Sequence, residues 1–378
     1  MANITNLLLE VSKPSGWWAS IYYWLEGIVL NYGWTILIFT IFVKLLMTPF
    51  DFFNRYSSRK NNFIQKRLTG QVQKINEKYK NNREKANAEM QALYKREGYN
   101  MFGTCIFSLL NIALTLFVFI SFFNTLRNIS AYKMVEQYTI LNETYAECNA
   151  RGLSKAERDA TLIQKYDEIS KDNHWLWIKN IWKNDSSVKV VPDYDALKSA
   201  TNSASDKKWK NTYFNAESDQ FITEEHYNEV MAPVINANPG WNGYFILAIL
   251  AGVLAYLSQL IADLSNKSKR AKDIASKAPT NPTDMQMQST MKILKFILPA
   301  VSVIFALSNP SAFGIYLITS SLMGIIFNFL IGLIVEKLTR KEEDKYLAYL
   351  EKEALNNLKR QKKAPPQMVN YKQISRNF

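Results

Sequence analysis

The sequence contains little cysteine and little histidine, which limits the chemistry that we expect from it. Its two cysteines, Cys105 in an apolar run and Cys148 in a polar stretch, predict neither a disulfide framework nor a metal knuckle. Both histidines, His174 and His226, lie in one long polar segment. The chain also lacks the glycine patterns of Walker, Rossmann and nucleophile-elbow sites. We therefore expect no enzymatic activity, no metal and no cofactor.

The N-terminal residues are not organised like a removable signal peptide. The stretch MANITNLLLEVSKPSGWW lacks a basic region followed by an apolar core and a small-residue cleavage site, so we expect the mature chain to begin near Met1. Further along, SGWWASIYYWLEGIVL is crowded with aromatic residues, which are enriched at membrane surfaces. Segment 1–27 is predicted to lie outside the membrane, and its aromatic part forms either an interfacial helix or an extension of the first span.

Long apolar runs separated by charged segments are the main feature of the sequence. Although 48% of the 378 residues are hydrophobic, mean hydropathy is −0.17, because the charged segments dilute the apolar runs. A helix needs about 20 apolar residues to cross the hydrocarbon core of a membrane. Four runs are long enough, and a fifth is shorter and contains a lysine and a proline: 28–50, 101–123, 241–262, 312–335 and, as the short run, 291–308.

The distribution of charge predicts the topology of these runs. Lysine and arginine outnumber aspartate and glutamate in 51–100, 263–298 and 336–378, whereas 127–240 is slightly acidic. Cytoplasmic loops carry an excess of lysine and arginine, so the three basic segments should share that side, which requires that the short run also spans. We predict an all-α membrane protein with five transmembrane helices, an outer N-terminus and a cytoplasmic C-terminus.

Four further segments are predicted to lie outside the membrane. They are a cytoplasmic helical hairpin at 51–100, a long extracytoplasmic insert at 124–240, a cytoplasmic loop at 263–290 and a basic cytoplasmic tail at 336–378. The hairpin is expected to turn at Asn81-Asn82, with Glu84 at the capping-box offset from Asn81.

The insert and the tail each contain a predicted helix. Ser154 to Ser170 should be helical, with Glu157 at the capping-box offset, whereas 193–219 is polar and receives no predicted fold. Between them, HWLWIKNIW is an aromatic patch suited to resting on a membrane surface. The tail places four apolar residues on or near one helical stripe: Leu338, Tyr346, Leu350 and Leu358.

Lys44 lies inside the first predicted transmembrane helix, where a lysine costs about 3 kcal/mol on insertion scales. Its Cα is about 12 Å from Phe52 at the cytoplasmic end, and snorkelling covers about half of that distance. Four of the predicted spans also carry a polar stripe at helical spacing. Together with Lys44, the residues of these stripes that we select are Thr40, Thr48, Ser108, Asn111, Thr115, Gln259, Tyr316, Ser320 and Asn328.

Two interpretations of these stripes are open. Serine, threonine and glycine commonly lie in contacts between transmembrane helices, which is enough to explain a single stripe. Four stripes and a lysine together favour a hydrophilic groove within the membrane, because ionisable residues in spans usually face a bundle interior or a water-filled cavity. Lys44 would then be a fixed cation for a carboxylate of a bound chain, unless it forms a structural ion pair with Asp51 or Asp263.

The order of these parts resembles that of the YidC-type membrane protein insertases, a family with mitochondrial and chloroplast relatives. Three stretches carry the resemblance. NYGWTILIFTIFVKLLMTPF resembles the family's first core span, and KYKNNREKANAEMQALYKREGYNMFGTC resembles its cytoplasmic hairpin running into the second span. MKILKFILPAVSVIFALSNPSAFGIYLITSSLMGIIFNFL resembles the last two spans. The insert is longer than we expect for five-span members.

Several groove positions differ from the family's pattern. The family carries an arginine where this chain has Lys44, so the charge is retained but the planar fork that grips a carboxylate is not. Asn111 stands in place of a glutamine, Leu317 in place of a tryptophan and Ser321 in place of an asparagine, whereas Gln259 matches a family glutamine.

The resemblance implies an insertase and chaperone of the bacterial plasma membrane, which inserts and folds client transmembrane helices alone or with the Sec translocon. The ten selected polar residues would line its client groove. The implied partners are nascent membrane protein clients, the Sec translocon, membrane lipids and, through the basic tail, the ribosome. We expect a monomer.

Two other classes of protein are considered. A secondary transporter or channel would also use an intramembrane polar cavity, but the internal repeats typical of transporters are not evident. A passive membrane anchor for ribosomes would keep the basic tail but would not need Lys44.

Overall fold

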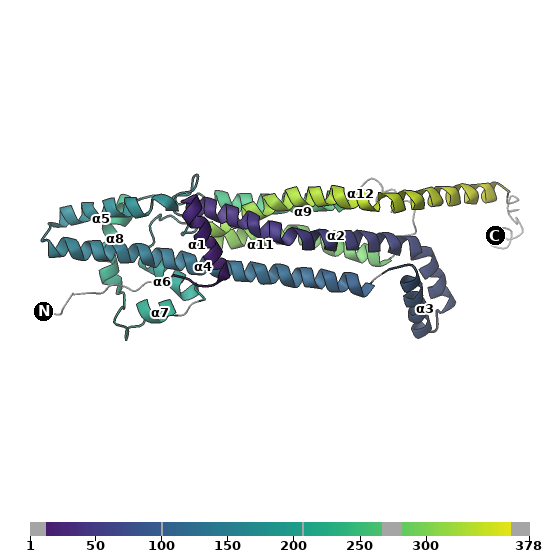
Figure 1. Cartoon of the computed structure of the whole chain (residues 1–378), viewed down its shortest axis with the longest axis horizontal. Coiled ribbons are helices and arrows are strands. Elements are labelled where there is room, and N and C mark those ends of the chain that lie inside the picture. The colour runs from purple at the N-terminus through teal and green to yellow at the C-terminus, as the bar shows by residue number, and fades with distance from the viewer. Residues whose placement is uncertain (1–12, 100, 206–207, 267–281, 364–378) are drawn as a thin grey trace, which may run out of the picture.

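The computed structural model describes residues 13–99, 101–205, 208–266 and 282–363, which form helices and loops without a strand (Figure 1). The elements, in chain order, are α1 (Trp17–Val29), α2 (Tyr32–Lys78), α3 (Arg83–Arg96), α4 (Met101–Ala150), α5 (Lys155–Ile169), the 3-10 turn η1 (Lys171–Asn173), α6 (Tyr194–Ser203), α7 (Lys208–Tyr213), α8 (Glu224–Ala237), α9 (Ile246–Asn266), α11 (Pro282–Ser308) and α12 (Ser311–Lys363). This architecture confirms the predicted all-α class.

Three helices among the described residues are long and apolar enough to cross a membrane, and they contain the first, second and fifth predicted spans. These helices, α2, α4 and α12, run along the long axis of the molecule, and α2 packs against both of the others (Figure 1). The other two predicted spans coincide with shorter apolar stretches, Ile246–Ala262 of α9 and Lys295–Ser308 of α11. Both α9 and α11 pack against each other and against α12.

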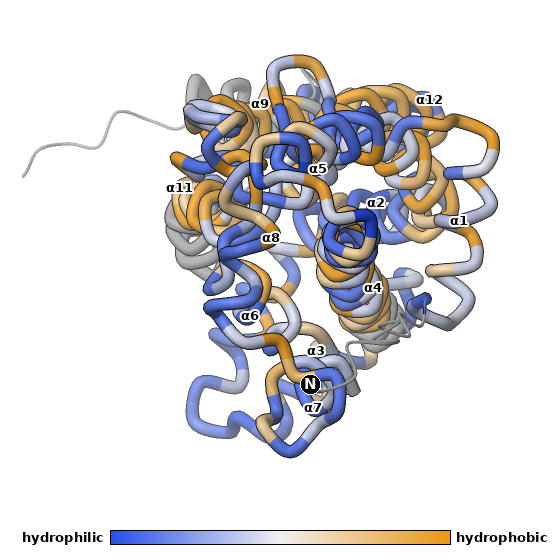
Figure 2. The backbone as a smooth tube through the Cα atoms, turned by 90° about the vertical axis from the view of Figure 1, so that its left-hand side faces the viewer, coloured by the Kyte–Doolittle hydropathy of each residue, from blue (hydrophilic) through white to orange (hydrophobic). Residues whose placement is uncertain are grey.

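Each long helix continues beyond its apolar part into a polar region. α2 enters the hairpin, which it forms with α3, and α12 enters the basic tail. At the opposite end, α4 enters the insert, whose residues include α5, α6, α7 and α8. We call these the hairpin end and the insert end of the bundle. In Figure 2 the hydrophobic colour gathers on α9, α11 and α12, and the hydrophilic colour on α5, α6 and α8.

α1 is a separate helix and not an extension of the first span. Leu30 adopts a left-handed conformation (φ 59°) that ends α1, and the Asn31 side chain accepts a hydrogen bond from the Trp34 amide to cap α2. Trp18 packs edge-on against Phe39 of α2, with ring centroids 5.6 Å apart. Of the two sequence-based alternatives, an extension of the first span is therefore wrong, and the aromatic residues form a helix of their own.

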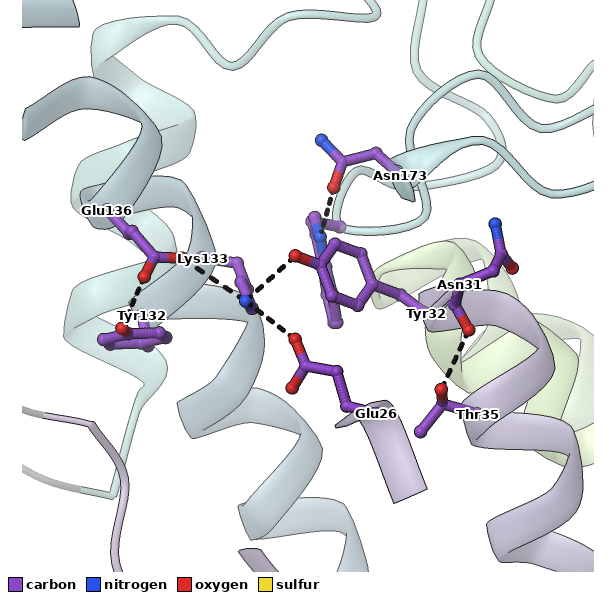
Figure 3. Close-up of polar contacts among 9 residues, drawn as sticks. Glu26, Asn31, Tyr32, Thr35, Tyr132, Lys133, Glu136 and Asn173 are labelled. Atoms are coloured by element: carbon purple, nitrogen blue, oxygen red, sulfur yellow. Dashed lines mark hydrogen bonds and ion pairs between the residues drawn. The ribbon is translucent and has the colours of Figure 1, made fainter. Parts of the chain in front are cut away.

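A buried charge cluster joins α1, α2 and α4 at the insert end of the bundle (Figure 3). Lys133 of α4 is only 7% exposed, and its Nζ lies 3.0 Å from Glu26 Oε1 of α1 and 3.0 Å from the Tyr32 hydroxyl of α2. Glu136 Oε2 is 3.3 Å away on the next turn of α4. A buried ammonium needs such partners to offset its lost hydration, so the cluster fixes α1 against the bundle.

The hairpin turns where the sequence predicts, but its cap lies one residue later. α2 ends at Lys78, and the Asn82 side chain accepts from the Lys85 amide at 3.0 Å to begin α3. Asn82, and not Asn81, is therefore the N-cap, which moves Glu84 out of the capping-box position.

The tail is not a separate solvated helix, because its first part packs on the hairpin as a continuation of α12. Tyr346 and Leu350 are each 8% exposed in a small apolar cluster with Phe63, Leu68 and Leu93. Leu338 points away and is 56% exposed, and the Leu358 side chain lies outside the described residues. The predicted apolar stripe is thus in part a packing surface between the tail and the hairpin.

The insert shares one apolar core with the bundle, in which Leu162 and Trp182 belong to the same cluster as Phe39 and Phe313. Its first helix is the prolongation of α4, on which α5, α6 and α8 pack. The α5 capping box forms as predicted: Ser154 and Glu157 bond each other reciprocally, and the hydrogen bonds from the Ser154 side chain and amide lower the pKa of Glu157. Residues 193–219, for which the sequence predicted no fold, contribute α6 and α7.

Most of the aromatic patch HWLWIKNIW is buried in the core. Trp175 and Trp182 are 6% and 0% exposed, and Trp182 Nε1 donates to Asn173 Oδ1 at 2.8 Å. Among the large apolar residues of this stretch, only Leu176 is strongly exposed, with 64% of its surface accessible. Aromatic composition does not separate the two outcomes, since indole rings suit both a membrane interface and a core with a hydrogen-bond partner.

The loop 174–193 is bonded to the insert end of the bundle through Asn242. This side chain is fully buried, donates to the Asn180 and Lys183 carbonyls at 2.8 and 3.2 Å, and accepts from the Asn180 amide at 2.7 Å. The Lys183 carbonyl also accepts from the Ser311 amide, at the start of α12. Asp185 Oδ2 accepts from the Ala248 amide of α9. The loop therefore ties α9 and α12 together.

We expect Asn242→Ala to destabilise this region by about 1–3 kcal/mol, because it leaves buried backbone groups without their partners. Urea unfolding of the purified chain, followed by tryptophan fluorescence, measures the change. The control is Asn236→Ala on the surface of α8, for which we expect a change within about 0.5 kcal/mol. Equal effects of the two substitutions would show that the loop does not depend on Asn242.

Candidate functional site

A groove with a cavity volume of about 820 Å³ lies between five helices in the apolar part of the bundle and extends toward the hairpin end. Its walls come from α2, α4, α9, α11 and α12. It reaches the surface of α4 at Leu116, which is 53% exposed. The groove collects polar residues that are far apart in the sequence, and six of the ten selected residues line it: Lys44, Thr115, Gln259, Tyr316, Ser320 and Asn328. We call it the Lys44 groove.

The other four selected residues do not line the groove in the described part of the structure. Thr40 is fully buried and donates to the Ile36 carbonyl of its own helix, so it belongs to helix packing. Thr48 donates to the Lys44 carbonyl at 2.8 Å. Asn111 Nδ2 lies 3.4 Å from Asp51 Oδ1 and reaches the groove only through that carboxylate. The Ser108 side chain lies outside the described residues.

Lys44 is positioned by the continuous α2 helix, which carries it to the groove wall. Its backbone carbonyl accepts from Thr48, and its side chain is half-buried. Asp51, two turns later, also lines the groove, but no carboxylate among the described side chains lies within 4.0 Å of the Lys44 ammonium. A pair with Asp51 is therefore not formed, and the Asp263 side chain lies outside the described residues.

The half of the groove nearest the hairpin is lined by α2 residues that the sequence analysis did not select. Arg55 donates to the Asn328 carbonyl at 2.8 Å and to its side-chain oxygen at 2.6 Å. Arg59 forms a two-pronged ion pair with Glu343 of α12, at 2.9 and 3.0 Å, and Glu343 is 2% exposed. These bonds hold α2 and α12 together at the mouth of the groove.

A helical repeat in the sequence was the available signal for these residues. Asp51, Arg55, Ser58 and Asn62 follow Lys44 at steps that keep one face of a helix, and all of them line the groove. The predicted boundary at residue 50 separated them from the span, although α2 continues through it to Lys78.

Positive charge exceeds negative charge along the groove. Because Arg59 and Glu343 neutralise each other, the remaining described charges are those of Lys44, Arg55, Lys66 and Asp51. The neighbouring outward-facing side chains are apolar, and Leu45 and Leu46 are 54% and 48% exposed. Such a groove can accept a polar or acidic group next to an apolar surface, where charge interactions are less screened than in water.

Comparisons with known proteins identify the family of the chain. The model of the family described as 60Kd inner membrane protein matches residues 24–337. Over 105 residues, the chain is 36% identical to the membrane protein insertase YidC of Cupriavidus taiwanensis and to that of Cupriavidus necator, and 34% identical to that of Burkholderia vietnamiensis.

Each of these matched segments covers 26% of this chain and 18% of the relative, so the chain matches less than a fifth of the length of these curated relatives. The relatives are named as insertases, which are not enzymes. With its apolar helices, the chain is a multi-pass protein of the inner membrane. The match over most of its length shows that the chain belongs to the 60Kd inner membrane protein family, the family of the YidC-type membrane protein insertases.

Proposed function

We propose that the chain is a membrane protein insertase and chaperone that binds the polar end of a client transmembrane helix in the Lys44 groove. The observation that carries this proposal is the groove itself, which brings Lys44, Gln259 and Ser320 from three helices to one polar cavity among apolar helices. The family supplies the class of client, a nascent membrane protein. No cofactor or hydrolysis is needed.

The proposed topology has five transmembrane helices, with α9 and α11 spanning together with α2, α4 and α12. The hairpin and tail then face the cytoplasm, and the insert lies outside, as the distribution of basic residues predicts. The apolar part of α11, Lys295–Ser308, is short for a span. A locally thinned bilayer would accommodate it, and thinning also shortens the apolar barrier beside the groove.

The proposed mechanism separates the polar and apolar parts of the client. The client approaches at the hairpin end, and its polar end enters the groove, where fixed polar groups replace part of its hydration. Its apolar helix then moves into lipid, which is favourable by about 25 cal/mol for each Å² of apolar surface removed from water. Lys44 holds the polar end of the client as a point charge, and water replaces this contact when the client leaves the groove.

The proposed partners follow from charge and from the family. The Sec translocon would act beside the chain on larger clients, and the hairpin and basic tail would face the ribosome or anionic lipids. Because Tyr346 and Leu350 pack on the hairpin, a docking tail would present its polar face and not this apolar stripe. We propose a monomer as the working unit.

Insertion into protein-free vesicles and into vesicles with the purified chain tests this function. We expect a one-span client to become protease-protected only with the chain, and Ser320→Trp, which fills the groove, to reduce insertion at least tenfold. Ile326→Trp adds the same ring on α12 at a residue that is 48% exposed and outside the groove. Client insertion by this variant should therefore equal that by the unmodified chain.

The same vesicles distinguish an insertase from a transporter or channel. With a trapped fluorescent solute and no client, an insertase should leave the solute inside. Solute release or uptake that Ser320→Trp blocks, without client insertion by the unmodified chain, would instead assign the groove to transport.

A further inference from the structure

A second cavity, with a volume of about 330 Å³, lies at the insert end of the bundle, away from the Lys44 groove. It is formed by α4, the loop after η1, α6 and the turn between α11 and α12. The side chains that define its chemistry are Arg127, Ser130, Lys183, Ser199, Ser203 and Asn309. Two of them are cations, and none of the described residues that line this cavity is acidic.

Lys183 is the most unusual of these residues. It is 8% exposed, and no carboxylate among the described side chains lies within 4.0 Å of its ammonium. The charge of Asp193 acts on Lys183, but the Asp193 carboxylate accepts from Lys189 at 3.1 Å and from the Ala196 amide at 3.0 Å. Burial lowers the pKa of Lys183, as expected for an ammonium without a close counter-ion. An anion in the cavity would supply that counter-ion.

Arg127 and Ser130 add donors from one face of α4. Arg127 Nη2 donates to Asn309 Oδ1 at 3.3 Å, and its guanidinium lies 4.2 Å from the centroid of the Phe123 ring, which holds the group in place. No ion pair occupies Arg127 among the described residues. Ser130 is 2% exposed, and its hydroxyl has no hydrogen-bond partner in the described part of the chain. A buried hydroxyl without a partner is costly, and a bound ligand would satisfy it.

The position of the cavity along the bundle is also informative. The apolar run of α4 ends at Phe123, and Arg127 lies four residues later. Asn309 lies in the turn that follows the apolar part of α11. Both therefore lie at the depth where the hydrocarbon core ends and lipid phosphates begin. The insert, through Lys183 and α6, closes the side away from the membrane.

We propose that this cavity binds a phosphate group, either that of a phospholipid headgroup or a free phosphate. Arginine offers a planar fork, lysine a point charge, and Ser130, Ser199 and Ser203 offer hydroxyl donors, which together match the several oxygens of a phosphate. A volume of about 330 Å³ admits a phosphate with a small attached headgroup. In a phospholipid, the acyl chains would leave the cavity toward the bundle surface.

Two binding measurements on the full-length chain in a phosphate-free, non-ionic detergent test this site. The first is calorimetric titration with inorganic phosphate at constant ionic strength, with chloride as the reference anion. The second is native mass spectrometry with added phosphatidylglycerol, compared with a diglucosyl glycerolipid that has no phosphate. Binding in the lipid measurement alone identifies a headgroup site, and binding of inorganic phosphate alone identifies a free-anion site.

Three variants separate this site from general attraction to a basic protein. Lys183→Gln should weaken phosphate binding at least about tenfold, because it removes a charge-assisted hydrogen bond. Ser199→Glu keeps both cations but places a carboxylate at the rim of the cavity, and should prevent binding even if Lys183→Gln fails to fold. Lys198→Gln removes one charge from the exposed face of α6 outside the cavity and should bind normally.

Binding that is lost in Ser199→Glu and kept in Lys198→Gln supports the proposal, and a tenfold weakening in Lys183→Gln assigns the contact to the buried ammonium. Absence of binding in both measurements overturns the proposal, as does binding that Ser199→Glu leaves unchanged.

Discussion

Lys44→Glu is expected to abolish insertion of a small one-span client whose translocated end is acidic, and Lys44→Ala to reduce it at least tenfold. The groove cation can offset part of the cost of bringing a carboxylate into an apolar region, and one unit of charge at this depth corresponds to about 3 kcal/mol on insertion scales. Glutamate reverses the interaction, whereas alanine only removes it. Lys44→Arg should insert at least as well as the unmodified chain, because it restores the charge and adds a planar fork.

The measurement is the protease-protected fraction of client in reconstituted vesicles with equal amounts of each variant. Lys74→Ala is the matched control, since it removes one exposed charge from the same helix, α2, outside the groove. A client with a neutral polar end provides a second comparison. In Lys44→Ala, its protease-protected fraction should fall less than that of the acidic client. Equal insertion by all Lys44 variants would mean that polarity of the groove acts without a fixed cation.

Six of the residues selected from the sequence line one cavity and the others do not, for reasons that lie in tertiary packing. Thr40 and Lys44 are one helical turn apart on the same face of α2, yet Thr40 is fully buried and Lys44 lines the groove. Periodicity predicts which residues share a face. It does not predict which neighbouring helix covers that face, and at Thr40 the predicted stripe is a packing surface.

At the hairpin end the error came from dividing the chain by hydropathy. The apolar run stops near Phe50, but hydrogen bonds continue the helix, so Arg55 and Arg59 extend the polar face beyond the predicted span. The tail was separated from the last span in the same way, although α12 is one helix from Ser311 to Lys363. Hydropathy places membrane boundaries, whereas helix ends depend on capping residues and helix breakers.

The insert shows a different limit of the sequence. Ser154 and Glu157 specify a local capping box, so the start of α5 was predictable from residues three apart. HWLWIKNIW depends on partners such as Asn242, which is distant in the chain, and Asn173, which is outside any local motif. Residues 193–219 depend on α4 and α8, against which α6 packs. Their burial could not be inferred from composition.

The ion pair between Arg59 and Glu343 joins α2 to α12 at the mouth of the groove and provides the second large expected effect. Its side chains are 12% and 3% exposed. Removing one partner of a buried ion pair costs about 3–5 kcal/mol, because the remaining charge loses the group that offsets its lost hydration. We therefore expect Arg59→Ala and Glu343→Ala each to lower the thermal unfolding midpoint of the purified chain markedly. Each should also speed protease cleavage of the α12 segment beyond residue 336.

Replacing both partners with apolar residues should have a much smaller effect on stability than either single change. Arg59→Met combined with Glu343→Leu removes both buried charges and fills similar volumes, and such replacements of buried pairs are often neutral or stabilising. Arg340→Ala is the surface control: Arg340 pairs with Asp344 at 3.6 Å with side chains 64% and 49% exposed, a class of pair worth about 0–1 kcal/mol. If Arg59→Ala were no more destabilising than Arg340→Ala, the buried pair would not be what holds α12 on α2. The apolar cluster of Phe63, Tyr346 and Leu350 would then have to hold the two helices together at the mouth of the groove.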